Sequence, residues 1–112
     1  MINTDLSVKT TPLSKYNMVA SVTDNVKIKT GHVVTVSIAG QIDKQYPQGV
    51  AYDITTYATD FPLHTNNLST IDNYGNIWKM VWDNNMLSIA CMSATVAANT
   101  FIYLNMTFIT AS

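Results

Sequence analysis

Residues 77–92 decide the fold class, and they read Ile-Trp-Lys-Met-Val-Trp-Asp-Asn-Asn-Met-Leu-Ser-Ile-Ala-Cys-Met. Two strand-like runs flank Asn84 and Asn85, and asparagine tolerates the left-handed backbone of a two-residue hairpin turn. With that turn, one face of the hairpin is entirely apolar, and the opposite face is mixed. The apolar cross-strand pairs are Trp82 with Leu87, Met80 with Ile89, and Trp78 with Cys91. We therefore predict an antiparallel hairpin whose tryptophan face is the core face.

The last apolar run, residues 101–111, alternates in the same way. Its predicted core face consists of Ile102, Leu104, Met106 and Phe108. The opposite face, which contains Phe101 and Tyr103, is only half polar. A monomeric sandwich needs one apolar face per sheet, so a surplus apolar face indicates a second partner. We expect Phe101 and Tyr103 to lie in a contact between subunits.

Upstream, period-two alternation and β-branched residues predict further strands. They cover residues 26–30, 32–42 and 50–58 and, more weakly, 18–22 and 70–72. Residues 50–58 are expected to place Tyr52, Ile54 and Thr56 on one face and Ala51, Asp53, Thr55 and Tyr57 on the other. Residues 59–69 are expected to be irregular, because Pro62 cannot continue a ladder. We expect an all-β fold, an antiparallel β-sandwich or Greek-key barrel, with no helical segment.

Residues 1–16 are rich in Thr, Ser, Asn and Lys and have little periodicity. We interpret them as a linker or as the end of a preceding domain, and residues 17–112 as one β domain. A chain of 112 residues suits a single core. We expect neither a membrane span nor a secretory signal, because long apolar runs and a basic start are missing.

The composition is unusually poor in charge: 12% of the residues are charged and 47% are hydrophobic. All basic residues are lysines, so bidentate contacts from arginine to phosphate or guanine cannot form. We therefore expect no nucleic-acid partner. Cys91 is the only cysteine, which excludes an intrachain disulfide and suggests a buried apolar thiol.

Catalytic and metal-binding motifs are missing from the sequence. No phosphate loop, zinc-type cysteine pair or nucleophile elbow is present. The acidic residues are all aspartates and are scattered, so the sequence does not indicate a paired-carboxylate hydrolase. His32 and His64 are far apart in sequence, and we expect no metal and no cofactor.

Sugar recognition suits this composition better, because it needs an aromatic platform and hydrogen-bonding groups rather than charge. Loops carry binding sites more often than strands do. The candidate saccharide-binding residues are Asp60, His64, Asp72, Tyr74 and Trp82. Ordinary turn chemistry is the alternative interpretation for each loop residue. Trp82 lies one residue from a turn, so its edge could reach the surface, whereas Trp78 is expected to be pure core.

Three stretches carry a resemblance to a known family: a polar leader, the strand Gly-His-Val-Val-Thr-Val-Ser-Ile-Ala-Gly at 31–40 with Tyr-Pro-Gln-Gly at 46–49, and the closing strand at 101–111. The chain resembles the C-terminal head domain of receptor-binding proteins from tailed phages of lactic acid bacteria, in particular the lactococcal siphophages. The resemblance covers about residues 17–111, and its motifs are loose and strand-like.

This resemblance implies a homotrimer of β-barrel heads at the distal tail or baseplate of a virion, made in the host cytoplasm. Such heads bind saccharides or glycerol-phosphate groups of the host cell wall without catalysis, and their N-terminal side meets other baseplate proteins. Family sites use a Trp, a His and an Asp, often with an Arg. Trp82, His64 and either Asp60 or Asp72 could serve here. The missing arginine favours neutral hydroxyl groups as the ligand.

A structural domain for trimerisation or baseplate assembly, binding only protein, is the alternative. The region 60–76 would distinguish the two. Saccharide binding requires its polar side chains to face solvent in a cleft, whereas assembly would bury them against another chain.

Overall fold

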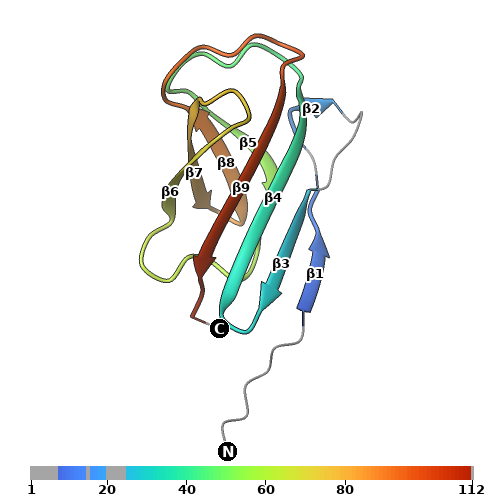
Figure 1. The fold of residues 1–112 in the computed structure, drawn as a ribbon, viewed down its shortest axis with the longest axis vertical. Coiled ribbons are helices and arrows are strands. Elements are labelled where there is room, and N and C mark those ends of the chain that lie inside the picture. The colour runs from blue at the N-terminus through green and yellow to red at the C-terminus, as the bar shows by residue number, and fades with distance from the viewer. Residues whose placement is uncertain (1–7, 15, 20–24, 112) are drawn as a thin grey trace, which may run out of the picture.

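The computed structural model describes residues 8–14, 16–19 and 25–111. These residues form nine β-strands and no helix (Figure 1). The strands are β1 (Val8–Pro12), β2 (Met18–Val19), β3 (Val26–Thr30), β4 (Val33–Ile42), β5 (Ala51–Thr56), β6 (Asn67–Ile71), β7 (Ile77–Asp83), β8 (Met86–Cys91) and β9 (Phe101–Ile109). The predicted all-β class is confirmed.

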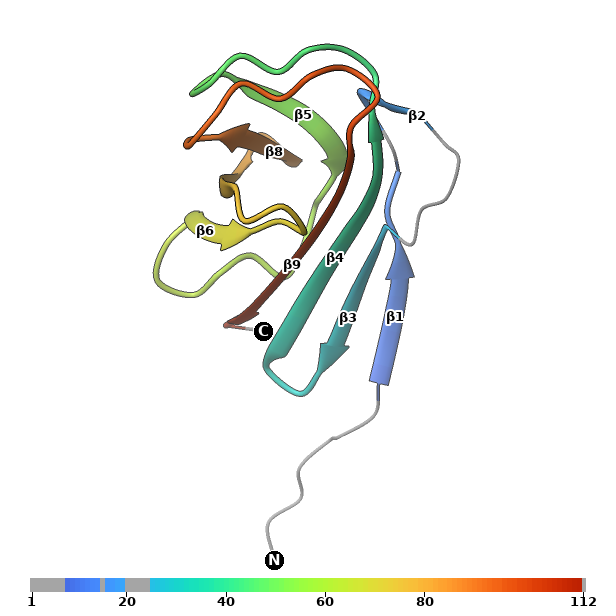
Figure 2. The same cartoon turned by 45° about the horizontal axis from the view of Figure 1, so that its top comes forward.

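The strands form two antiparallel sheets with one core between them (Figure 2). In sheet 1, β1, β3 and β4 follow one another, β9 pairs along β4, and the short β2 pairs with the last residues of β4. Sheet 2 has the order β5-β8-β7-β6. Within the described strands, β5 and β6 each have one ladder partner, so the sheets do not close into the barrel that we considered.

The β7–β8 hairpin has the predicted register. Trp78 pairs with Cys91, Met80 with Ile89 and Trp82 with Leu87. Asn84 and Asn85 have φ values of 49° and 60°, as a two-residue turn requires. All six paired side chains are buried, which confirms the tryptophan face as the core face.

Aromatic side chains from both sheets meet in this core. Trp82 makes edge contacts with Tyr57 and with Phe108 of β9, at ring-centroid distances of 6.0 and 5.3 Å. Trp78 contacts the edge of Tyr46, which stacks on Tyr52 at 4.1 Å. Edge-to-face and offset arrangements are the favoured geometries of aromatic pairs. Trp82 therefore fixes the hairpin of sheet 2 to sheet 1, and Trp78 packs the hairpin against the connection between β4 and β5.

The long ladder between β4 and β9 runs from the pair Val33–Ile109 to the pair Gln41–Phe101. Ile102, Leu104, Met106 and Phe108 face the core, as predicted. The alternate residues of β9 face outward. The first residue of β1, Val8, lies in the same row as Val33 and Ile109, so the described chain starts and finishes at one end of sheet 1.

The face assignment for residues 50–58 is wrong in its second half. A β-bulge between Asp53 and Thr55 shifts the register of β5 against β8. Ile54, Thr55 and Tyr57 are consequently all buried. A bulge inserts one residue into one strand, so strict alternation cannot continue across it.

Two segment boundaries also differ from the sequence-based expectation. Residues 8–12, which we placed in the linker, form β1 and pair with β3. Residues 67–69, which we expected to be irregular, belong to β6 and pair with β7. Both strands are mainly polar and lie at sheet borders, where apolar alternation is weak. Residues 1–7, 15 and 20–22 lie outside the described residues.

We predict that two core tyrosines make the protein sensitive to alkaline pH. Burial, followed by the nearby charges of Asp43 and Asp60, raises the pKa values of Tyr46 and Tyr57 above the ordinary value of 10.0. The folded state then holds neutral phenols while the unfolded chain ionises. The free energy of unfolding should therefore fall as the pH rises above 10 and be unaffected by these groups below it.

Urea denaturation at a series of pH values from 7 to 11 tests this prediction. The double variant Tyr46→Phe/Tyr57→Phe should be less stable than the wild type at pH 7, because it loses two hydroxyl hydrogen bonds, but should lose stability less steeply above pH 10. Tyr16→Phe, at an exposed tyrosine, is the control and should keep the wild-type slope. An unchanged slope in the double variant would reject the assignment.

Candidate functional site

Asp72 is a buried residue that supports the turn between β6 and β7 through hydrogen bonds. Its Oδ1 accepts hydrogen bonds from the backbone N–H groups of Tyr74 and Asn76, at 2.7 and 2.9 Å. Its Oδ2 accepts a hydrogen bond of 2.7 Å from the indole N–H of Trp78. With 7% of its surface exposed and both oxygens engaged, the carboxylate supports the turn instead of facing a ligand.

Tyr74 projects from the turn that Asp72 supports, and 64% of its surface is exposed. The neighbouring Gly75 has a φ of 82°, which permits the tight turn. Asn73 fixes the turn to sheet 1, because its Nδ2 donates to the Phe101 carbonyl at 3.3 Å and its Oδ1 accepts from the Tyr103 N–H at 3.1 Å. The exposed ring of Tyr74 is therefore carried on a rigid base.

Asp60 takes part in an ion-pair cluster with two lysines of β3. Its carboxylate lies 3.2 Å from the Lys27 ammonium and 3.0 Å from the Lys29 ammonium. Lys27 also donates to the carbonyl and hydroxyl of Thr59, and it lies 4.7 Å from the centre of the Tyr57 ring. Asp60 thus neutralises two lysines, one of them buried, at the edge of the core.

The β3 lysines have an orientation that sequence reasoning missed. Lys27 and Lys29 pair with Val36 and Val34 and share their inward side. The intervening Val26 and Ile28 consequently face outward. The signal in the sequence was the Val-Lys-Ile-Lys alternation, but its direction depends on Asp60, about thirty residues later in the chain.

Trp82 is 1% exposed and packs between Tyr57 and Phe108. The expectation that its edge reaches the surface is therefore wrong. The turn at Asn84 and Asn85 begins after Asp83, so the strand carries the indole fully into the core.

His64 is exposed at the rim of a shallow pocket of about 360 Å³ beside the end of β9. The pocket is lined by Pro62, Leu63, His64, Thr65, Leu68, Thr107, Phe108 and Ile109. Its threonine hydroxyls already bond within the protein, Thr65 to Asn67 and Thr107 to Thr35. His64 is thus the polar lining residue best placed for a ligand, and the pocket is otherwise mainly apolar.

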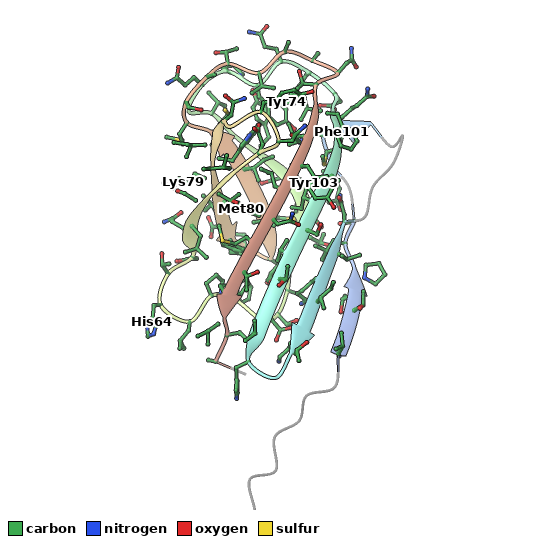
Figure 3. The ribbon with its side chains drawn as sticks, viewed as in Figure 1. His64, Tyr74, Lys79, Met80, Phe101 and Tyr103 are labelled. Atoms are coloured by element: carbon green, nitrogen blue, oxygen red, sulfur yellow. The ribbon has the colours of Figure 1, made fainter. Side chains whose placement is uncertain are left out.

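The structure does not bring the five predicted saccharide-binding residues together. Figure 3 shows His64 and Tyr74 at opposite ends of the molecule. Trp82 is buried, and Asp60 and Asp72 are engaged in internal contacts. Tyr74 and His64 therefore mark two separate candidate surfaces.

Phe101 and Tyr103 lie on the outward side of β9, as the alternation predicts, and Tyr103 is 45% exposed. They belong to the outer face of sheet 1. On the described strands this face consists of Val8, Thr10, Pro12, Val26, Ile28, Thr30, Val33, Thr35, Ser37, Ala39, Gln41, Phe101, Tyr103, Asn105, Thr107 and Ile109. None of these side chains carries a charge.

Within residues 8–14, 16–19 and 25–111, no group of three or more His, Cys, Asp or Glu side chains lies close enough to hold a metal ion. The same residues contain no helix that could span a membrane.

Comparisons with known proteins do not place the chain in a family. No family model, no curated protein and no solved structure matches it.

We predict that Asp72 is required for stability, in contrast to an ordinary turn residue. Asp72→Ala should lower the free energy of unfolding by about 2–4 kcal/mol, because it leaves two backbone donors and the buried Trp78 indole without their acceptor. His64→Ala is the matched control at an exposed loop position and should change it by less than about 0.5 kcal/mol. Chemical denaturation measures both, and equal stability of the two variants would contradict the role of Asp72.

Proposed function

We propose that the protein is a non-catalytic adhesion head that works as a homotrimer and binds a saccharide of the host cell wall at the distal end of a phage tail. The subunit contact is the outer face of sheet 1, with Phe101 and Tyr103 on its β9 border. The class of protein and the number of subunits come from the family resemblance of the sequence. The surface for association comes from the side chains of sheet 1.

The orientation of β3 is the observation that carries this proposal. A strand at the surface of a monomer normally turns its apolar residues inward and its lysines to water. Here Lys27 and Lys29 point inward, where Asp60 neutralises them, and Val26 and Ile28 point outward. Placing charge inside and apolar groups outside costs stability in an isolated chain, and a partner covering the outer face would offset that cost.

The rest of the outer face has the same character. Val33 and Ile109 are 46% and 57% exposed, and the central pairs of β4 and β9 are the uncharged Thr35–Thr107 and Ser37–Asn105. Interface cores are depleted in charged residues and enriched in aromatic residues such as Tyr103. Several heads in one assembly would also multiply the avidity of weak saccharide sites.

A protein-only assembly domain is the second candidate. The engagement of Asp60, Asp72 and Trp82 inside the chain favours it, because three of the five predicted saccharide residues do not face solvent in a cleft. This candidate is a domain for trimerisation or baseplate assembly that binds only protein, so it differs from the adhesion head in saccharide binding.

Self-association is tested by light scattering coupled to size exclusion. The wild type should show about three times the chain mass of 12.4 kDa. Tyr103→Asp should shift the mass toward the monomer, because it places a charge in a dry contact. Ser69→Asp, on an exposed position of β6 in sheet 2, is the control and should keep the wild-type mass. A wild-type monomer at every concentration would reject the proposal.

Adhesion is tested with insoluble cell walls of lactic acid bacteria. The wild-type protein should sediment with the walls, be displaced by soluble wall polysaccharide, and release no sugar into the supernatant. An oligomer that fails to sediment with any wall preparation would favour the assembly domain. Release of sugar would reject the non-catalytic assignment.

A further inference from the structure

Three connecting segments meet at the end of the molecule opposite Val8 and Ile109. They are the connection 43–50 between β4 and β5, the β6–β7 turn 72–76, and the connection 92–100 between β8 and β9 (Figures 1 and 2). We call this surface the loop end. Since Val8 and Ile109 share the first row of sheet 1, the described chain enters and leaves at the other end, and the loop end is clear of both.

The loop end is rigid because its three segments are bonded to one another. Tyr46 and Val96 exchange two backbone hydrogen bonds, of 2.8 and 2.9 Å. The Met92 carbonyl accepts from the Gln48 amide, and the Ile77 N–H donates to the Ser93 hydroxyl at 2.9 Å. Together with the hydrogen bonds of Asp72 and Asn73, these bonds hold the backbone at Tyr74 in one geometry.

The loop end is mainly neutral and polar. Its charged residues are the buried Asp72 and the exposed neighbours Asp43 and Lys44, and the Lys44 ammonium lies 4.7 Å from the centre of the Tyr52 ring.

Amides and hydroxyls are frequent at the loop end. The side chains of Gln48, Asn73, Ser93, Thr95 and Thr100 bond within the chain, and Gln45, Asn76 and Asn99 supply further amides. Tyr74 rises among these groups as the most exposed aromatic ring of the described residues.

We propose that the loop end is a binding surface for a neutral saccharide, with the Tyr74 ring as the platform on which one sugar stacks. This inference rests on the proposed adhesion function and gives it a location and a ligand class. A flat aromatic ring suits the apolar face of a pyranose, and surrounding amides and hydroxyls can exchange hydrogen bonds with its hydroxyl groups. A ring on a pre-ordered turn loses little conformational freedom on binding.

The scarcity of positive charge decides between ligand classes. A phosphate-bearing polymer would call for several lysines or arginines, and the loop-end segments contain one lysine, Lys44, which lies over the Tyr52 ring and follows Asp43 in the chain. The nearby carboxylate of Asp72 is buried and fully engaged, so it offers no acceptor to a ligand. The His64 pocket, with its mainly apolar lining, provides few hydrogen-bonding groups for sugar hydroxyls.

The experiment measures affinity of the full chain for an array of neutral oligosaccharides and glycerol-phosphate polymers. The wild type should bind neutral members. Tyr74→Ala should bind them about tenfold more weakly or worse, whereas Tyr74→Phe should keep most of the affinity, because stacking needs the ring. His64→Ala tests the rival pocket, and Tyr16→Ala removes another exposed tyrosine as the matched control. Both should bind like the wild type.

The outcomes separate this inference from the proposed function. Wild-type affinity in Tyr74→Ala, with a loss in His64→Ala, would overturn the loop end and leave saccharide adhesion intact. Preference for the glycerol-phosphate polymers would overturn the ligand class. A folded wild-type oligomer that binds no array member would overturn adhesion itself, together with the loop-end site. Unchanged melting temperatures of the Tyr74 variants are needed to show that the loss is local, and circular dichroism measures them.

Discussion

The hydrogen bond from the Trp78 indole to Asp72 connects the core of this protein to its most exposed aromatic residue. Trp78 belongs to the apolar face that packs the two sheets together, and Asp72 supports the turn that presents Tyr74. Trp78 would be costly to bury without an acceptor, and Asp72 would be costly to bury without donors. The hydrogen bond between them satisfies both buried groups. Because the packing of the hairpin places Trp78, it also determines where Asp72 and its turn lie.

Local patterns predicted the parts of the fold that depend on local chemistry. The asparagine pair at 84–85 fixed the register of β7 and β8, and simple alternation assigned both faces of β9. The bulge in β5 was not predictable, because a run of alternating residues carries no mark of the inserted residue. Which side of β3 faces the core depends on Asp60, which lies far away in sequence, so the alternation of lysines did not indicate the direction of the side chains.

The candidate site likewise contains residues that the local sequence predicted correctly and residues that it did not. Residue type and nearness to a loop selected five side chains, and only His64 and Tyr74 are exposed. Asp60 and Trp82 have partners that lie far away in the sequence, which a single sequence does not reveal. Asp72 bonds to two N–H groups of its own turn and to the indole of nearby Trp78, so its inward position depends on the burial of Trp78. The polar segments of the loop end are visible in the sequence, but only the fold brings residues 43–50, 72–76 and 92–100 to one place.

The contacts that fix β6 and its turn to sheet 1 have a second consequence. Beside β9, Thr70 donates to the Asn105 carbonyl at 2.7 Å, and Asn73 bonds to both Phe101 and Tyr103. Side chains thus form hydrogen bonds to main-chain groups on the edge of β9 that faces away from β4. An unpaired edge of a long strand is a template for cross-β aggregation. The bonds from Thr70 and Asn73 leave fewer free main-chain groups on this edge of β9 for pairing with a foreign strand.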